Sequence, residues 1–141
     1  MRFVVLDASI VAKWVFLESG SDKAEKLLLK QDLFYVPDLF YIEMDAVISK
    51  KFRKKELNYE EVYIKREQIK QLAIYSVQHE VVSDLAFEIA ITLPITIYDS
   101  LYLALAIESD SILWTADDRL VRGMEKTIFS NYVKNPLHGM N

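Results

Sequence analysis

The chain has 141 residues, of which 52% are hydrophobic, and a formal net charge of −4 at pH 7. This length and composition suit one compact domain, and only three Gly and three Pro leave little room for linkers. The absence of Cys excludes disulfides and thiolate metal sites, and His79 and His138 are too far apart in the sequence to suggest a zinc-ligand pair. No apolar stretch reaches the length of a membrane span and no leader pattern is visible, so we expect a cytoplasmic protein without membrane contact.

Apolar runs alternate with helical patterns from the start of the chain. Phe3–Leu6 is a continuous apolar run, typical of a strand that is buried on both faces, and small residues after it turn the chain into a helix. Ser21–Lys30 has a helical pattern, and Leu33–Val36 is a second strand. Pro37 suits a helix start, and the next helix is expected over Leu39–Lys55.

The same alternation continues to the end of the chain. An Ala/Leu-rich helix is expected from Tyr98, and Thr96, three residues before Asp99, marks its start as in a capping box. The other expected elements are a charged helix over Asn58–Leu72, a strand over Ala73–Val77, a helix over Val82–Ile91, a strand over Ile112–Thr115, a helix headed by Asp117, a last strand over Thr127–Ser130 and a loose tail over 135–141. Strands that alternate with helices predict an α/β domain with a mostly parallel sheet.

Four acidic residues stand at or just after the junctions between strands and helices. Asp7 and Asp117 follow apolar strands, Asp99 lies in the first turn of the Ala/Leu-rich helix, and Glu43 lies about a turn and a half into its helix. Ligands of an open parallel sheet bind beyond the carboxyl ends of its strands, so these side chains are expected to converge there. A set of carboxylates suits a hard divalent cation, and the four look like the ligand set of a metal-dependent nuclease.

Each of these acids also has an ordinary structural interpretation. Asp7, Asp99 and Asp117 are placed where Asp often only caps a helix, whereas Glu43 lies past the first turn, where a solvated helix face is the alternative. Caps are free to be Ser, Thr or Asn, yet all four residues here are carboxylates. The set therefore favours a common site.

The motifs around these acids resemble those of PIN-domain ribonucleases of the VapC toxin type. The matching stretches are Val5–Ser9, Pro37 with Glu43 six residues on, Tyr98–Ala106 and Leu113–Leu120. They occur in the family's order and cover nearly the whole chain. The sequence departs from the family pattern at Asp110-Ser111, which replaces the Gly usual before the fourth strand, and 50–83 carries no family motif.

This resemblance implies a single PIN-like nuclease domain over 1–141, with a three-layer α/β/α architecture and a short, mostly parallel central sheet. It implies that Asp7, Glu43, Asp99 and Asp117 are the catalytic, metal-binding acids, with Ser9 and Thr115 as supporting hydroxyls. The expected cofactor is Mg²⁺ or Mn²⁺, and the expected activity is hydrolysis of RNA phosphodiester bonds. The resemblance also implies a small antitoxin partner and a homodimer.

Three further features have a functional and an ordinary interpretation. Asp118, next to Asp117, either supports the metal site from the outer shell or is simply an exposed acid at a helix N-terminus. A basic cluster at the end of the Glu43 helix either grips the RNA backbone or only complements the helix dipole. This basic cluster consists of Lys50, Lys51, Arg53, Lys54 and Lys55. Three aromatic residues either stack on bases or pack in the core: Tyr41, Tyr98 and Tyr102.

Other classes of protein fit the sequence less well. A phosphotransfer protein also places an Asp after its first strand, but Asp7-Ala8-Ser9 lacks the second Asp of such phosphatases and the adjacent acid pair of receiver domains. A non-catalytic PIN-fold interaction module would be favoured by loss of an acid, and none is lost. A housekeeping RNA-processing nuclease differs from a toxin only in partner and target, and stays an alternative.

Overall fold

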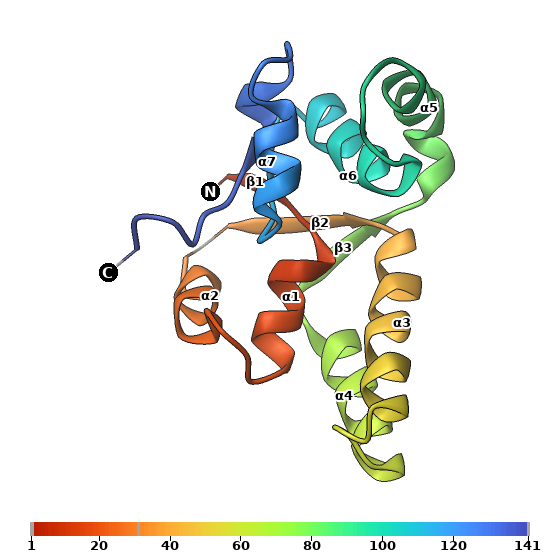
Figure 1. Ribbon diagram of the computed structural model, residues 1–141, viewed down its shortest axis with the longest axis vertical. Coiled ribbons are helices and arrows are strands. Elements are labelled where there is room, and N and C mark those ends of the chain that lie inside the picture. Colours follow the sequence, from red (N-terminus) through yellow and green to blue (C-terminus); the bar gives the residue numbers. More distant parts are fainter. Residues whose placement is uncertain (1, 31, 141) are drawn as a thin grey trace.

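The computed structural model describes residues 2–30 and 32–140, which form a parallel sheet between two layers of helices (Figure 1). The strand order is β3-β2-β1-β4-β5, and every neighbouring pair is parallel. The strands are β1 (Phe3–Leu6), β2 (Leu33–Pro37), β3 (Ile74–Val77), β4 (Ile112–Trp114) and β5 (Val133–Lys134). The predicted three-layer α/β/α fold is confirmed.

Helices cover both faces of this sheet. One layer contains α1 (Ala8–Val15), α2 (Ser21–Leu28), α3 (Leu39–Arg53) and α4 (Tyr59–Gln71), and the other contains α5 (Ser83–Thr92) and α6 (Ile97–Glu108) (Figure 1). α7 (Asp118–Met124) follows β4 and packs beside β5. The predicted helices are confirmed to within a few residues at their ends. No helix in the described part of the chain is both long enough and apolar enough to cross a membrane.

The core is built around β1 and α6. Val4, Val5 and Leu6 are all fully buried, as expected for a central parallel strand covered on both faces. α6 packs against β1, β2 and β4, and its residues from Ser100 to Ala106 are all buried. An Ala- and Leu-rich helix can be buried on nearly all sides in this way. Its N-terminal turn, which carries Asp99, is therefore held at the carboxyl edge of the sheet.

The last strand lies elsewhere than predicted. Thr127–Ser130 is not a strand, because the Thr127 hydroxyl donates to the carbonyl of Met124 at 2.8 Å and accepts the N–H of Phe129 at 3.2 Å. Local side-chain bonds of this kind favour a turn over a sheet. The strand that completes the sheet is β5, whose Val133 and Lys134 pair with β4.

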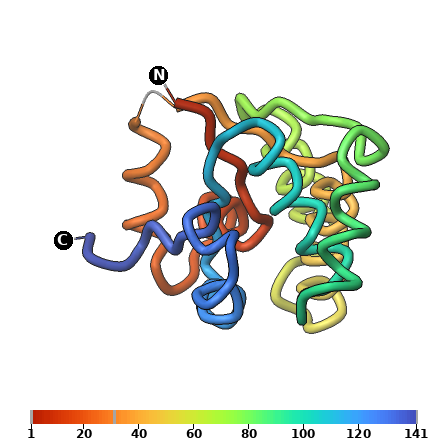
Figure 2. The backbone as a smooth tube through the Cα atoms, turned by 90° about the horizontal axis from the view of Figure 1, so that it is seen from above, coloured from red at the N-terminus to blue at the C-terminus, as the bar shows by residue number. Residues whose placement is uncertain are grey.

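The expected loose tail is anchored over its described part. Asn135 and Pro136 are buried, and Leu137 and Met140 pack against the core. Figure 2 shows this segment, in blue, running from the α7 region toward the side of the molecule that carries α2. Asn141 lies outside the described residues.

The departure at Asp110 has a clear geometric consequence. Asp110 follows α6 with a φ of 50°, in the left-handed region where Gly is ordinarily favoured. The N–H of Asp110 donates to Ile107 O at 3.1 Å and that of Ser111 to Ala106 O at 2.8 Å, which is the bonding pattern of a Schellman motif. The turn that leads into β4 is thus made without glycine.

Candidate metal site at the carboxyl edge of the sheet

The topology brings the four predicted acids to one edge of the sheet. Asp7 directly follows β1, and Asp117 follows the adjacent strand β4. Glu43 is on α3, which starts after β2, on the other side of β1. Asp99 is in the first turn of α6, which begins at this edge before running back to β4. The strand order reverses between β1 and β4, which is where open α/β sheets place their ligand crevice.

Two hydroxyls fix one oxygen of Asp7. Ser9 Oγ donates to Asp7 Oδ2 at 2.5 Å, and Thr115 Oγ1 donates to the same atom at 2.9 Å. The hydroxyls are in turn held by the following loop, because Ser9 Oγ accepts the N–H of Ala116 at 2.9 Å and Thr115 Oγ1 accepts that of Asp117 at 3.0 Å. The ends of β1 and β4 therefore form one hydrogen-bonded unit.

Glu43 is held by a buried tyrosine. The hydroxyl of Tyr102, whose residue is 1% exposed, donates to Glu43 Oε1 at 2.5 Å. This bond joins α3 to α6, so it links elements from opposite layers of the fold. A solvated helix face does not describe Glu43, and base stacking does not describe Tyr102.

Asp99 and Asp117 line a common cavity of about 330 Å³. Arg119 and Thr96 also line it, so the positively charged Arg119 shares this cavity with the two carboxylates. Larger cavities occur between α3 and α4 and between α1 and α4, but neither is lined by any of the four acids.

The acids repel one another across the site. The pKa of Asp99 is raised from 3.8 to about 6, first by burial and then by the charges of Asp7 and Asp117. Burial also raises the pKa of Glu43, against the effect of the Tyr102 hydrogen bond, and the charges of Asp7 and Asp99 add to the rise. Burial and mutual repulsion thus disfavour the ionised forms of Asp99 and Glu43 in the folded protein.

Three of the acids divide their two oxygens in the same way. One oxygen is engaged by the protein: Oδ2 in Asp7, Oε1 in Glu43 and Oδ1 in Asp117, which accepts the N–H groups of Arg119 and Leu120. Within residues 2–30 and 32–140, the second oxygen of each accepts no hydrogen bond. One oxygen thus orients the side chain, and the other is available to a ligand.

The capping alternatives have different outcomes at the three Asp residues. Asp7 stands at the N-cap of α1 but makes no capping bond with its side chain. Thr96, not Asp99, caps α6, through a bond of 3.1 Å from the N–H of Asp99 to its hydroxyl. Asp117 does cap α7. Only for Asp117 is the capping interpretation correct, and there it occupies one oxygen.

Asp118 is engaged by the C-terminal segment and not by the predicted metal ligands. Its Oδ1 accepts Asn135 Nδ2 at 2.9 Å and lies 2.7 Å from His138 Nε2. These hydrogen bonds, that from Asn135 above all, lower the pKa of the Asp118 carboxyl. Its direct partners are therefore residues of the C-terminal segment.

The basic cluster is divided between two surroundings. Lys50, Lys51 and Lys54 line a cavity of about 350 Å³ between α1 and α3. Arg53 and Lys55 are exposed and do not line it. Lys51 is already engaged, since its Nζ lies 4.0 Å from a carboxylate oxygen of Glu18 and 3.6 Å from one of Glu56.

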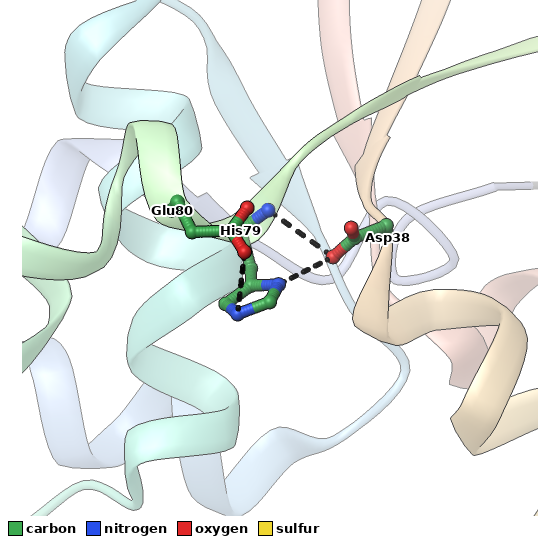
Figure 3. A group of neighbouring side chains, drawn as sticks. All are labelled: Asp38, His79 and Glu80. Carbon is green, nitrogen blue, oxygen red and sulfur yellow. Dashed lines mark hydrogen bonds and ion pairs between the residues drawn. The ribbon is translucent and has the colours of Figure 1, made fainter.

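A second group of ligand-type side chains lies farther along the same edge, where β2 and β3 end (Figure 3). His79 Nδ1 is 3.0 Å from Asp38 Oδ1, and Nε2 is 3.7 Å from Glu80 Oε1. The N–H of His79 also donates to Asp38 Oδ1 at 3.1 Å, so the group fastens two strand ends together. The sequence suggested no metal site here because only a pair of His residues was considered, whereas the fold brings two acids, Asp38 and Glu80, to a single His residue.

This group is also the tighter one. Its ligand atoms all lie within 4.8 Å of one another, and no other three His, Asp or Glu side chains in the described chain do so. The four predicted acids are therefore more widely spread than in a closed metal centre. Such spacing suits an ion that keeps several of its waters, as Mg²⁺ does.

Comparison with known families decides the class of this fold. The PIN domain family model matches residues 4–125. The chain belongs to the PIN domain family. Comparison with curated proteins gives no significant match.

Solved structures share the PIN fold at low sequence identity. FitAcB from Neisseria gonorrhoeae has a TM-score of 0.67 at 15% identity, over 96% of this chain and 99% of that one. The Mycobacterium tuberculosis toxin VapC20, described as cleaving the sarcin-ricin loop, has a TM-score of 0.65 at 10% identity, over 81% and 89%. A toxin-antitoxin complex from Klebsiella pneumoniae has a TM-score of 0.64 at 11% identity, over 94% and 97%.

Proposed function

We propose that this PIN-domain protein is a metal-dependent endoribonuclease that hydrolyses RNA phosphodiester bonds, and that it is the toxin of a toxin-antitoxin pair. The observation that carries the nuclease proposal is the convergence of Asp7, Glu43, Asp99 and Asp117, with mutual repulsion and with oxygens left for a ligand. Membership of the PIN family supports it. The toxin proposal is supported by the descriptions of VapC20 and of the Klebsiella complex.

The donor set fits a divalent cation. Mg²⁺ and Mn²⁺ prefer carboxylate oxygens. Burial, and after it the charges of neighbouring carboxylates, raises the pKa of Glu43 and of Asp99. Asp7, Glu43, Asp99 and Asp117 would hold the ion. When bound, it would supply charge stabilisation for the phosphoryl oxygens and acidify a bound water.

The protein's own groups would orient these ligands. Ser9 and Thr115 hold Oδ2 of Asp7 and leave its Oδ1 for the ion. In the same way, Tyr102 holds Oε1 of Glu43 and leaves its Oε2 for the ion. No covalent intermediate on the enzyme is required.

The lysine-lined cavity is the proposed path of the RNA backbone. Lys50, Lys51 and Lys54 lie at the C-terminal end of α3, beyond Glu43, so an RNA strand crossing the acids can follow the groove between α1 and α3. Lys50 and Lys54 are the exposed members of this set. The net charge of −4 repels RNA at long range, so the attraction between these two lysines and RNA phosphates prevails only at close range.

A pair of matched double variants tests this path. Lys50→Gln with Lys54→Gln should weaken binding of a short unstructured RNA and lower the log-log salt slope by about 0.7 for each lost phosphate contact. Arg53→Gln with Lys55→Gln removes the same charge outside the cavity and should leave the slope nearly unchanged. Fluorescence anisotropy at several salt concentrations, with chelator present, measures both. Equal slopes in the two double variants would assign the cluster to the helix dipole instead.

A cleavage assay tests the activity itself. Protein stripped with chelator should cut RNA only after Mg²⁺ or Mn²⁺ is added, and Asp99→Asn should nearly abolish cleavage while the protein stays folded. Asp84→Asn, an exposed acid in the first turn of α5, is the matched control. If Asp99→Asn cut as fast as the parent, the assignment of Asp99 would be wrong. A folded parent that cuts no RNA with either metal would point to the non-catalytic PIN-fold module.

The partner proposals need separate tests. We expect a small antitoxin, encoded beside this protein, to bind it and to block cleavage, and we expect the chain itself to be a homodimer in the cytoplasm. Cleavage that is insensitive to the adjacent gene product would favour a housekeeping PIN-type nuclease.

A further inference from the structure

The PIN family match ends at residue 125, yet the chain beyond it completes the sheet. β5 pairs with β4, and the carbonyl of Lys134 accepts the N–H of Thr115 at 3.0 Å. Thr115 in turn bonds both Asp7 and the backbone of Asp117. The C-terminal segment is thus one residue away from two of the predicted metal ligands.

Asn135, the residue after β5, makes the second connection. It is 8% exposed, and its amide nitrogen donates to Asp118 Oδ1 at 2.9 Å. Its amide oxygen accepts the N–H of Leu137 at 3.0 Å, so the side chain is used at both ends. His138 also contacts Asp118, but its side chain is 69% exposed. Asn135 is therefore the buried partner of this acid.

The contact with Asp118 bears directly on the geometry of Asp117. Asp118 is the first residue of α7, and Asp117 caps the same helix through the N–H groups of Arg119 and Leu120. Any movement of this first turn changes the direction of the Asp117 carboxylate. Asn135 holds the first turn of α7 at Asp118, and the β5 carbonyl holds the chain just before this turn at Thr115.

We propose that Asn135 is a positioning residue that holds the first turn of α7 through Asp118 and thereby aims the carboxylate of Asp117 into the site. The inference rests on the proposed metal-dependent function for its consequence, but not for its geometry. It assigns a functional task to a residue that lies outside the family match.

The sharpest variant is Asn135→Asp, which has nearly the same shape and keeps the acceptor for Leu137 but replaces the donor with a carboxylate facing Asp118. It should weaken Mn²⁺ binding, followed by calorimetry, about tenfold, as is common when a ligand loses its outer support. Cleavage should lose kcat with little change in KM. His138→Ala removes the exposed partner of Asp118 and should change Mn²⁺ affinity less than twofold.

Exchanging the two side chains provides the rescue. In the double variant Asn135→Asp with Asp118→Asn, the amide and the carboxylate trade places, so the bond can form again with its direction reversed. Mn²⁺ affinity should recover to within about threefold of the parent. Failure of the exchange to recover any affinity, in a protein with parental melting behaviour, would overturn the proposal.

A readout without metal separates this proposal from the proposed function. In chelator, hydrogen exchange at the N–H groups of Arg119 and Leu120 should accelerate severalfold in Asn135→Asp, while exchange in α6 stays as in the parent. Unchanged exchange at these two amides would refute the positioning role even if the parent binds Mn²⁺. Accelerated exchange in Asn135→Asp, together with a parent protein that binds no Mn²⁺, would instead refute only the metal-dependent function. Equal acceleration throughout the protein would mean that Asn135 serves general stability, which also overturns the proposal.

Discussion

Removing the charge of Asp99 should stabilise the metal-free protein. The rise of its pKa from 3.8 to about 6 means that the folded state disfavours the ionised carboxylate, by about 3 kcal/mol at 1.36 kcal/mol per pKa unit. Asp99 is only half-buried, so solvent screening reduces this to about 1 to 2 kcal/mol. Asp99→Asn keeps the N–H that Thr96 accepts and should raise the free energy of unfolding at pH 7.5 by that amount.

The gain should depend on pH with a definite sign. Between about pH 4 and 6 the folded state binds more protons at Asp99 than the unfolded state does, so the parent loses stability as the pH rises through this window. The penalty is fully present only above about pH 7. At pH 4.5 the advantage of Asp99→Asn should fall to about a third of its value at pH 7.5.

Urea unfolding in chelator at the two pH values measures this difference, with the buried Trp114 as a fluorescent probe. Mn²⁺ at a hundredfold excess over its dissociation constant should then stabilise the parent by about 2.7 kcal/mol and Asp99→Asn by much less. Asp84→Asn controls for loss of a charge near a helix N-terminus. A destabilised Asp99→Asn at pH 7.5, or an advantage that does not change with pH, would refute the electrostatic reasoning.

Three further outcomes are expected. Light scattering should give the mass of a dimer for the parent and of a monomer for Phe87→Lys. Phe87 and Ile91 lie four residues apart on one face of α5 and are 60% and 63% exposed, so this apolar face is the expected dimer contact. A monomeric parent would contradict this. Asp110→Gly should raise the free energy of unfolding by about 0.5 to 1 kcal/mol by relieving a left-handed φ, and a loss of stability in urea unfolding would speak against strain there. Tyr102→Phe should lower the free energy of unfolding by about 1 to 2 kcal/mol and shift the acidic limb of the cleavage pH profile to higher pH, because Glu43 loses a hydrogen-bond donor. An acidic limb at the parental pH would mean that ionisation of Glu43 does not control the cleavage rate.

The long apolar runs made most of the fold predictable. Phe3–Leu6 and Leu33–Val36 are buried parallel strands, which need continuous apolar residues on both faces and therefore leave a strong signal. β5 could not be found in this way, because it pairs over only two residues, Val133 and Lys134. Its position is set by the neighbouring strand and not by its own pattern.

The convergence of the four acids was predictable from the sequence, and the family resemblance implied the hydroxyls of Ser9 and Thr115, but the bonds made by Tyr102 and Asn135 were not predictable. Junctions between strands and helices can be read from the sequence, and a parallel sheet gathers them at one edge. The bonds that orient the acids join residues far apart in the chain, such as Tyr102 to Glu43 and Asn135 to Asp118. Nothing local in the sequence distinguishes a core tyrosine from a donor to a carboxylate.

Asp117 explains why structural and functional interpretations of such junctions need not exclude each other. A carboxylate has two oxygens, and the helix amides of α7 use only Oδ1. Ser, Thr or Asn would cap the helix equally well, but none would leave a charged oxygen for a cation. The cap holds the side chain still, which is what a metal ligand would require, so the proposed ligand role of Asp117 and its role as a helix cap are compatible. The same division at Asp7 and Glu43, where hydroxyl donors replace the helix amides, suggests that a fixed oxygen beside a free one is the common design of this site.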